Sequence, residues 1–202
     1  MASYMRCRKR KRVKATLAAF LILIALILFY MAVSFNRTAS VAADRSFERA
    51  LNDAAGVAAE ITRAERIDIL KLVRGDNNCV DGIEVDMTAA NFIAERMRAG
   101  AEEYLHNACP QSVAVPLTSF LGLSVDGGAE AVLSLNSYIR AASAVEWAIT
   151  SGISCCVYTL FVNLKLSIEY SCLFVNDEVG MACCIPIAQY VADGEGLHIN
   201  FI

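Results

Sequence analysis

The stretch "GISCCVYTLFVNLKLSIEY", Gly152 to Tyr170, alternates apolar and polar residues along most of its length. Alternate residues of a strand point to opposite faces of a sheet. The apolar set of this stretch consists of Tyr158, Leu160, Val162, Leu164, Leu166 and Ile168, and the polar set of Asn163, Lys165, Ser167 and Glu169. This period of two is typical of an antiparallel strand that is buried on one face. The stretch therefore predicts the central strand of a sheet.

The sequence on each side of this strand predicts its partners. Before it, "AEAVLSLNSYIRAASAVEW", Ala129 to Trp147, predicts one or two strands. After it, "VNDEVG", Val175 to Gly180, predicts a turn, and "MACCIPIAQYVADGEG", Met181 to Gly196, predicts a returning strand. Pro186 has no N–H to donate, so it predicts an edge position or a local break. We expect an antiparallel sheet in the C-terminal half.

Helical patterns precede the sheet. From Ser40 to Arg74 the apolar residues alternate spacings of four and three, which is the mark of one helical stripe; its members are Phe47, Leu51, Ala54, Ala58 and Ile61. We expect this alanine-rich stripe to pack on its own domain, with dimerisation through a short coiled coil as the alternative. "RGDNNCVDG", Arg74 to Gly82, is dense in turn residues and predicts the end of that helix rather than an adhesion motif.

A short strand and a second helix follow. "IEVDM", Ile83 to Met87, alternates like a strand, and Thr88 is the expected N-cap of a helix that runs to about Asn107. One side of that helix carries Ile93, Met97, Ala101 and Tyr104. The fold class that we predict is α+β, with N-terminal helices followed by an antiparallel sheet.

An apolar run lies near the N-terminus. "ATLAAFLILIALILFYMAVSF", Ala15 to Phe35, holds 21 residues without a charge. A helix of that length measures about 31 Å, enough to cross the hydrocarbon core of a bilayer. A cleaved signal peptide is the main alternative, with small residues near Val41, but its apolar core would be shorter. We expect an uncleaved transmembrane signal anchor over residues 15–35.

Charge predicts the orientation of this anchor. Seven of the 18 Lys and Arg residues precede Ala15, and all 21 acidic residues follow Phe35, so the part beyond the span carries a net charge of about −10. The positive-inside rule places the basic end in the cytoplasm and the rest outside the cell membrane. An acidic domain also excludes nucleic acid as a partner, because such binding needs a basic face.

These patterns divide the chain into four parts. We expect a basic cytoplasmic tail over residues 1–14, the anchor over 15–35, a helical membrane-proximal segment over 36–75, and an extracytoplasmic α+β domain over 76–202. Its partners would be the lipid bilayer, through residues 15–35, and other envelope proteins. Homo-oligomerisation stays open.

Cysteines offer the strongest sign of chemistry. The chain holds eight, and none form the Cys-x-x-Cys pairs of a structural zinc site. If the two strands that carry the adjacent pairs lie side by side, a disulfide or thiol cluster could form from Cys155, Cys156, Cys183 and Cys184. The simpler interpretation, which we prefer, is that they behave as small buried apolar residues.

Other catalytic patterns are weak. The chain has two histidines, His106 and His198, and neither lies in a signature that would activate a cysteine. The sequence contains no glycine-rich phosphate loop and no Gly-x-Ser-x-Gly elbow. We therefore predict no catalytic residues, no metal and no cofactor.

Four segments in one order carry a resemblance to a known family. They are "VPLTSFLG" at Val115 to Gly122, "SGIS" at Ser151 to Ser154, "LFVNLKLSIEY" at Leu160 to Tyr170 and "IPIAQYVADGE" at Ile185 to Glu195. Over residues 115–196 the chain resembles the sporulation protein YunB family of endospore-forming bacteria. It departs from that pattern at Cys155-Cys156 and in its tail, "GEGLHINF".

The resemblance implies a process rather than a reaction. It implies a non-enzymatic single-pass protein, needed for endospore formation and anchored in the mother-cell membrane, which becomes the outer forespore membrane. Its extracytoplasmic domain would act through contacts with sporulation or envelope proteins. The alternative is a cell-envelope enzyme of the same topology that acts on peptidoglycan or on thiols. A pilus-like subunit ranks third.

Overall fold

The structure is a computed structural model that describes residues 2–64, 69–74, 80–121, 129–151, 155–172, 175–193 and 198–201. It contains two long helices, a short 3₁₀ helix and eight strands, within these ranges. Antiparallel sheets occupy the C-terminal half, so the predicted α+β class is confirmed. The chain divides into two compact units.

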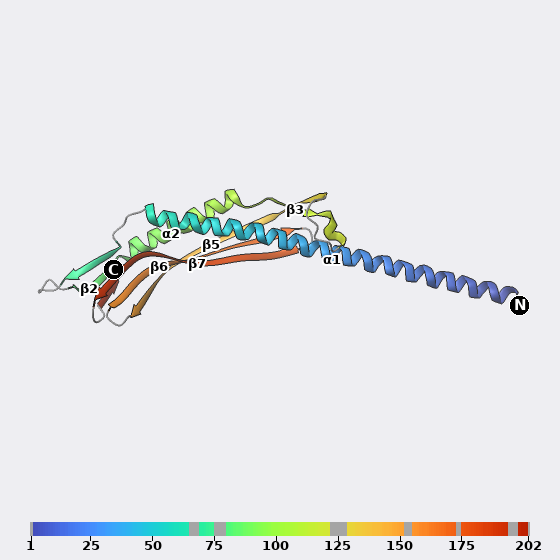
Figure 1. Cartoon of the computed structure of the whole chain (residues 1–202), viewed down its shortest axis with the longest axis horizontal. Helices are drawn as coiled ribbons and strands as arrows, with labels where there is room; N and C mark the ends of the chain where they lie inside the picture. Colours follow the sequence, from blue (N-terminus) through green and yellow to red (C-terminus); the bar gives the residue numbers. More distant parts are fainter. Residues whose placement is uncertain are drawn as a thin grey trace. The chain divides into compact units, whose positions relative to one another are not determined.

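Helix α1, Ala2–Ala64, contributes to both units (Figure 1). Its sequence contains no proline and a single glycine, Gly56, so nothing interrupts the hydrogen-bond ladder over 63 residues. The helix ends ten residues before the predicted end at Arg74, so the helical segment predicted over 36–75 is too long. Leu70 to Arg74 instead form strand β1, because their apolar residues pair across a ladder with a second strand.

Unit 1 comprises Met1–Ala43, Ser112–Leu135 and Cys172–Val175. Besides α1 it contains strand β3, Ser112–Pro116, the 3₁₀ helix η1, Leu117–Leu121, and strand β4, Glu130–Ser134. Strands β3 and β4 pair antiparallel. The hydroxyl of Ser34 on α1 donates to the Ser119 carbonyl oxygen at 2.8 Å, which joins η1 to the helix.

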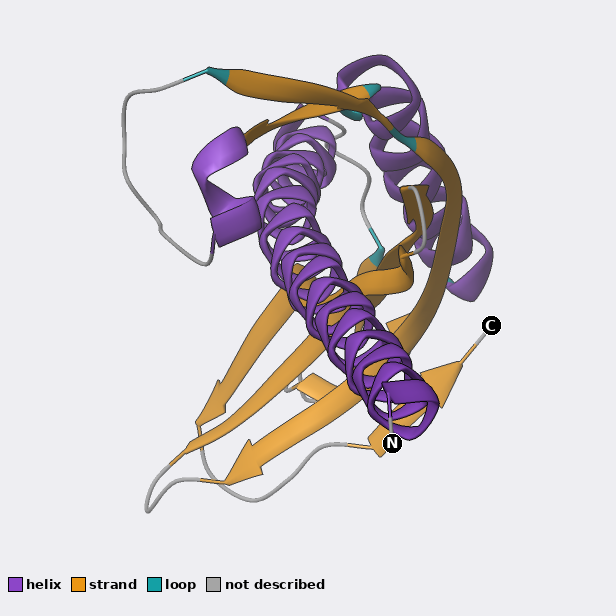
Figure 2. Ribbon diagram, turned by 90° about the vertical axis from the view of Figure 1, so that its right-hand side faces the viewer, coloured by secondary structure: helices purple, strands orange, loops and turns teal. Residues whose placement is uncertain are grey.

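Unit 2 contains Asp44–Gln111, Asn136–Ser171 and Asn176–Ile202. Its main sheet has the order β5-β6-β7, and the strands span Asn136–Ser151, Cys155–Cys172 and Val175–Asp193. Figure 2 shows these strands side by side. β6 is central, and its apolar face is buried as predicted. β7 begins at Val175, so the turn predicted at "VNDEVG" was wrong, and Pro186 lies in an edge strand as expected.

A smaller sheet completes unit 2. It has the order β1-β2-β8, with β2 at Val80–Val85 and β8 at His198–Phe201. β1 and β2 are antiparallel, whereas β2 and β8 are parallel. The parallel pair was not predicted, because its partners are more than 100 residues apart in sequence.

Helix α2, Met87–Ala108, packs on β5. Its N-cap is Asp86, whose Oδ1 accepts a hydrogen bond from the Ala89 amide at 2.9 Å, so the expected cap at Thr88 was wrong by two residues. The carboxylate replaces a missing intrahelical acceptor, which is the usual reason for aspartate at this position. Ile93, Met97 and Ala101 are buried as predicted.

The stripe of α1 packs on the same unit. Phe47, Leu51, Ala54 and Ala58 are at most 1% exposed. The ring of Phe47 lies 4.9 Å from that of Tyr170 on β6, and the Thr62 hydroxyl lies 3.4 Å from the Met97 sulfur on α2. The stripe therefore packs on its own domain, as the sequence predicts.

Candidate functional site

The first cysteine pair lies at the start of β6. In the ladder between β5 and β6, Cys156 stands opposite Ser151, and its Sγ lies 3.9 Å from the Ser151 Oγ. The side chain of Cys155 lies outside the described residues. Residues 152–154, which include most of the "SGIS" segment, also lie outside the described residues.

The second pair lies elsewhere along the sheet. Cys183 Sγ lies 3.8 Å from the Leu164 carbonyl oxygen, and Gly180 lies beside Ser167, so β7 runs antiparallel to β6 in this register. Leu164 is eight residues beyond Cys156, which corresponds to about 26 Å at 3.3 Å per residue. The sheet therefore does not bring the two cysteine pairs together.

The surroundings of Cys183 do not activate its thiol. Cys156, Cys183 and Cys184 are free cysteines. Burial raises the pKa of Cys183, and the neighbouring Cys184 raises it further. Burial also raises the pKa of Cys109 and of Cys172. A reactive cysteine needs a lowered pKa, because the thiolate is the nucleophile.

These shifts have a consequence for stability. A raised folded-state pKa means that the unfolded chain loses its thiol protons first as the pH rises. The contribution of these cysteines is thus fully present below the ordinary cysteine pKa and is lost as the pH rises through the raised values. We expect this contribution of the cysteines to stability to fall on the alkaline side.

Metal binding has no support in the described part of the chain. Among those residues, no group of three His, Cys, Asp or Glu side chains is placed to hold a metal ion. His106 lies in the last turn of α2, where it is exposed, and the backbone of His198 pairs with Gly82 at the parallel ladder. The two histidines are thus on different elements.

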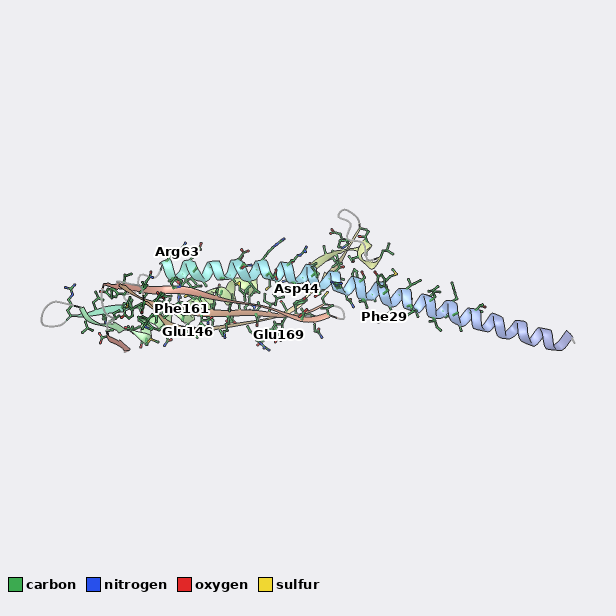
Figure 3. All side chains as sticks on the ribbon, turned by 60° about the horizontal axis from the view of Figure 1, so that its bottom comes forward. Phe29, Asp44, Arg63, Glu146, Phe161 and Glu169 are labelled. Atoms are coloured by element: carbon green, nitrogen blue, oxygen red, sulfur yellow. The ribbon has the colours of Figure 1, made fainter. Side chains whose placement is uncertain are left out.

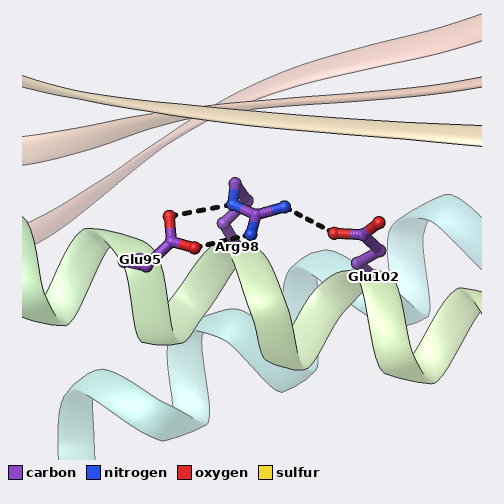
Figure 4. Close-up of polar contacts among 3 residues, drawn as sticks. All are labelled: Glu95, Arg98 and Glu102. Carbon is purple, nitrogen blue, oxygen red and sulfur yellow. Dashed lines mark hydrogen bonds and ion pairs between the residues drawn. The ribbon is translucent and has the colours of Figure 1, made fainter.

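A charged cluster lies on the surface of α2. Arg98 donates to Glu95 and to Glu102, three residues before it and four after it, with N–O distances of 2.5 Å (Figure 4). The hydrogen bond and positive charge of Arg98 lower the pKa of Glu95, and the two carboxylates raise the pKa of Arg98. Pairs at this spacing stabilise a helix surface. This geometry explains the cluster without a ligand.

The face of the main sheet opposite the core carries a polar network. Arg140 on β5 bonds Glu169 on β6 at 2.8 Å, and the Asn163 amide on β6 donates to Glu146 on β5 at 3.1 Å. Both pairs are diagonal neighbours in the ladder. These two pairs were not predicted from the sequence, although the polar positions of both strands recur with period two.

An open hollow of about 860 Å³ lies along the same unit. Its lining residues come from α2, β5, β6 and β7, and include Tyr138, Lys165 and the three small residues Ala142, Gly180 and Ala182. The small residues leave space for side chains of a partner protein.

The largest exposed apolar surface belongs to α1. Apart from the half-buried Met31, the large apolar side chains from Leu17 to Val33 are between 37% and 70% exposed, and Phe29, labelled in Figure 3, is the most exposed of them. This helix is long and apolar enough to span a membrane. A soluble domain rarely exposes so large an apolar patch, so the surface indicates contact with lipid.

Comparisons of the chain with protein families, with curated proteins and with solved structures found no match.

Proposed function

We propose that this chain is a non-enzymatic single-pass membrane protein that supports endospore formation through protein contacts of its extracytoplasmic domain. The observation that carries the membrane part is the exposed apolar surface of α1. A helical stretch that exposes large apolar side chains all around, without a polar stripe, is stable only in an apolar surrounding.

Charge supports the orientation. The basic residues before Ala15 favour a cytoplasmic N-terminus, and the acidic part beyond residue 35 would then face the outer side of the membrane. In a sporulating cell that side is the space between the mother cell and the forespore.

The sheet supports a role in protein contacts. β5 and β7 are the outer strands of the main sheet and hold 16 and 19 residues. An edge strand offers backbone N–H and C=O groups to an added strand of another chain. The hollow is lined by Ala142 of β5 and by Gly180 and Ala182 of β7, so side chains of a partner that contacts these outer strands would find space there.

The sporulation part rests on the resemblance to the YunB family. Of its four segments, "VPLTSFLG" covers the end of β3 and η1, "LFVNLKLSIEY" lies in β6, and "IPIAQYVADGE" lies mainly in β7. The resemblance thus falls on the sheet and on the element that joins α1, rather than on one loop.

Spore yield after deletion of the gene tests the proposal. We expect a large loss of heat-resistant spores, restored by the wild-type chain and by a variant with Cys155, Cys156, Cys183 and Cys184 all changed to serine. Rescue by the wild type alone would favour a thiol enzyme of the envelope. Normal sporulation of the deletion strain would contradict the developmental role.

The membrane topology is tested separately. In intact cells whose outer surface is accessible, protease added from outside should remove an epitope tag after Ile202 and spare one placed before Met1. Protection of the C-terminal tag with loss of the N-terminal one would reverse the proposed orientation.

A further inference from the structure

The element β3-η1-β4 sits on α1 at the end of the apolar run. Ser34, whose hydroxyl bonds the Ser119 carbonyl of η1 at 2.8 Å, comes one residue before the end of that run at Phe35. Phe35 is 4% exposed, and Ser119 and Val115 are also buried. The 3₁₀ helix is thus held beside the end of the apolar run, at Ser34, three residues before the first charged residue after the run, Arg37.

The outer surface of this element is apolar. Leu117 and Leu121 of η1 are 42% and 61% exposed, and Val132 of β4 is 72% exposed. Residues 112–121 contain no charge. The Leu117 amide donates to the Ala129 carbonyl at 2.9 Å, so η1 remains tied to the hairpin while its leucines stay uncovered.

These two observations determine the depth of η1 in a bilayer. If residues 15–35 fill the hydrocarbon core, Ser34 lies at its outer boundary with the headgroups. Anything bonded to Ser34 lies at the same depth. Uncharged, apolar side chains at that boundary gain from contact with acyl chains, at about 25 cal/mol per Å² of surface removed from water.

We propose that η1 inserts Leu117 and Leu121 into the outer leaflet, at the boundary between headgroups and acyl chains. The bilayer is then contacted twice, by the span of α1 and by η1, and this second contact fixes the rotation of the helix about its own axis. The inference rests on the proposed membrane anchor, and its occupant is lipid because the leucines continue the lipid-facing surface of the helix.

Tryptophan fluorescence in nanodiscs tests this contact. The full chain carries one tryptophan, Trp147, which is replaced by phenylalanine in every variant. A single tryptophan is then placed at Phe29, at Leu121 or at Ser112, an exposed residue at the end of β3 away from η1. Discs contain one chain each and phosphatidylcholine with or without bromine on its acyl chains. Circular dichroism confirms that the variants keep the wild-type helix content.

We expect Phe29→Trp and Leu121→Trp to lose emission in brominated discs, with the loss for Leu121→Trp at least about twice that for Ser112→Trp. Adding Leu117→Glu to Leu121→Trp should reduce its quenching. Quenching of Phe29→Trp without quenching of Leu121→Trp would overturn this inference alone. Absence of quenching at Phe29 would overturn the membrane anchor itself. Shielding of Leu121→Trp that appears only with several chains per disc would assign the leucines to a second copy and overturn the lipid contact.

Discussion

Two stretches of helix α1 have the same backbone and opposite surroundings. From Leu17 to Val33 most of the large apolar side chains are exposed, whereas the stripe from Phe47 to Ala58 is alanine-rich and buried. The more apolar stretch is the less buried one. Hydropathy therefore predicts whether a helix is surrounded by lipid or by water. Its burial against protein depends instead on the size and spacing of the residues on one face.

The largest test of this difference compares two phenylalanines of α1. Phe47→Ala should lower the free energy of unfolding by about 3 to 5 kcal/mol, because it removes a buried ring that contacts Tyr170. Phe29→Ala removes a ring that is 70% exposed and should leave that free energy within about 0.5 kcal/mol. Denaturant unfolding in detergent micelles measures both. Equal losses of unfolding free energy for the two variants would mean that the two stretches of α1 are not buried to different degrees.

A charged residue introduced into the apolar stretch of α1 tests whether that stretch spans a membrane. Leu26→Arg places a cation in the middle of the apolar run and should make membrane insertion less favourable by about 3 kcal/mol. Asp53→Arg, at an exposed position of the same helix, is the matched control and should insert normally. The fraction that remains in membranes after alkaline washing measures the change. Full retention of Leu26→Arg would argue against a span at this position.

The hydrogen bond between Tyr170 and Asp44 gives a third test, on the part of α1 that packs against protein. The Tyr170 hydroxyl donates to Asp44 Oδ1 at 2.6 Å, and Tyr170 is buried. Tyr170→Phe should cost about 1 to 2 kcal/mol of stability, since a bond to a charged acceptor is lost. Tyr138→Phe, on an exposed tyrosine, serves as the control and should cost less than about 0.5 kcal/mol. If chemical denaturation gave equal losses of unfolding free energy for the two variants, the hydrogen bond between Tyr170 and Asp44 would not stabilise the core.

The smallest expected effect separates two helical glycines. A Cβ at Gly56 on α1 would meet nothing within 4 Å, so Gly56→Ala should stabilise the protein by about 0.5 to 1 kcal/mol. A Cβ at Gly100 on α2 would overlap the Ile61 side chain, which should cancel that gain. Thermal melting compares the two. Destabilisation by Gly56→Ala would instead indicate that another chain packs on this part of α1, as in the coiled-coil alternative.

Several elements follow from local patterns. The apolar run over residues 15–35, the stripe at Phe47 to Ala58 and the alternation along β6 each repeat with the period of one secondary structure. The errors occur where local signals compete. "VNDEVG" has the composition of a turn but lies in an edge strand, where one side faces water and polar residues are tolerated. Asp86 and Thr88 both suit an N-cap, and only the geometry selects Asp86.

The candidate site was less predictable than the fold. Two cysteine pairs in neighbouring strands suggested a thiol cluster, yet the register places Cys183 opposite Leu164 and Cys156 opposite Ser151. A shift of about eight residues in that register would have been needed to bring the pairs together. Strand register depends on contacts across the whole sheet, so composition near the cysteines does not determine it.

By itself, the sequence determined the α+β class, which face of β6 is apolar, and that one helix is long and apolar enough to span a membrane, because these properties depend on neighbours within a few residues. Only the tertiary structure decided the parallel pairing of β2 with β8, the separation of the cysteine pairs, and the bond that holds η1 beside Ser34. Each of these joins residues that are distant in sequence, and their pairing depends on how the whole core packs rather than on local periodicity.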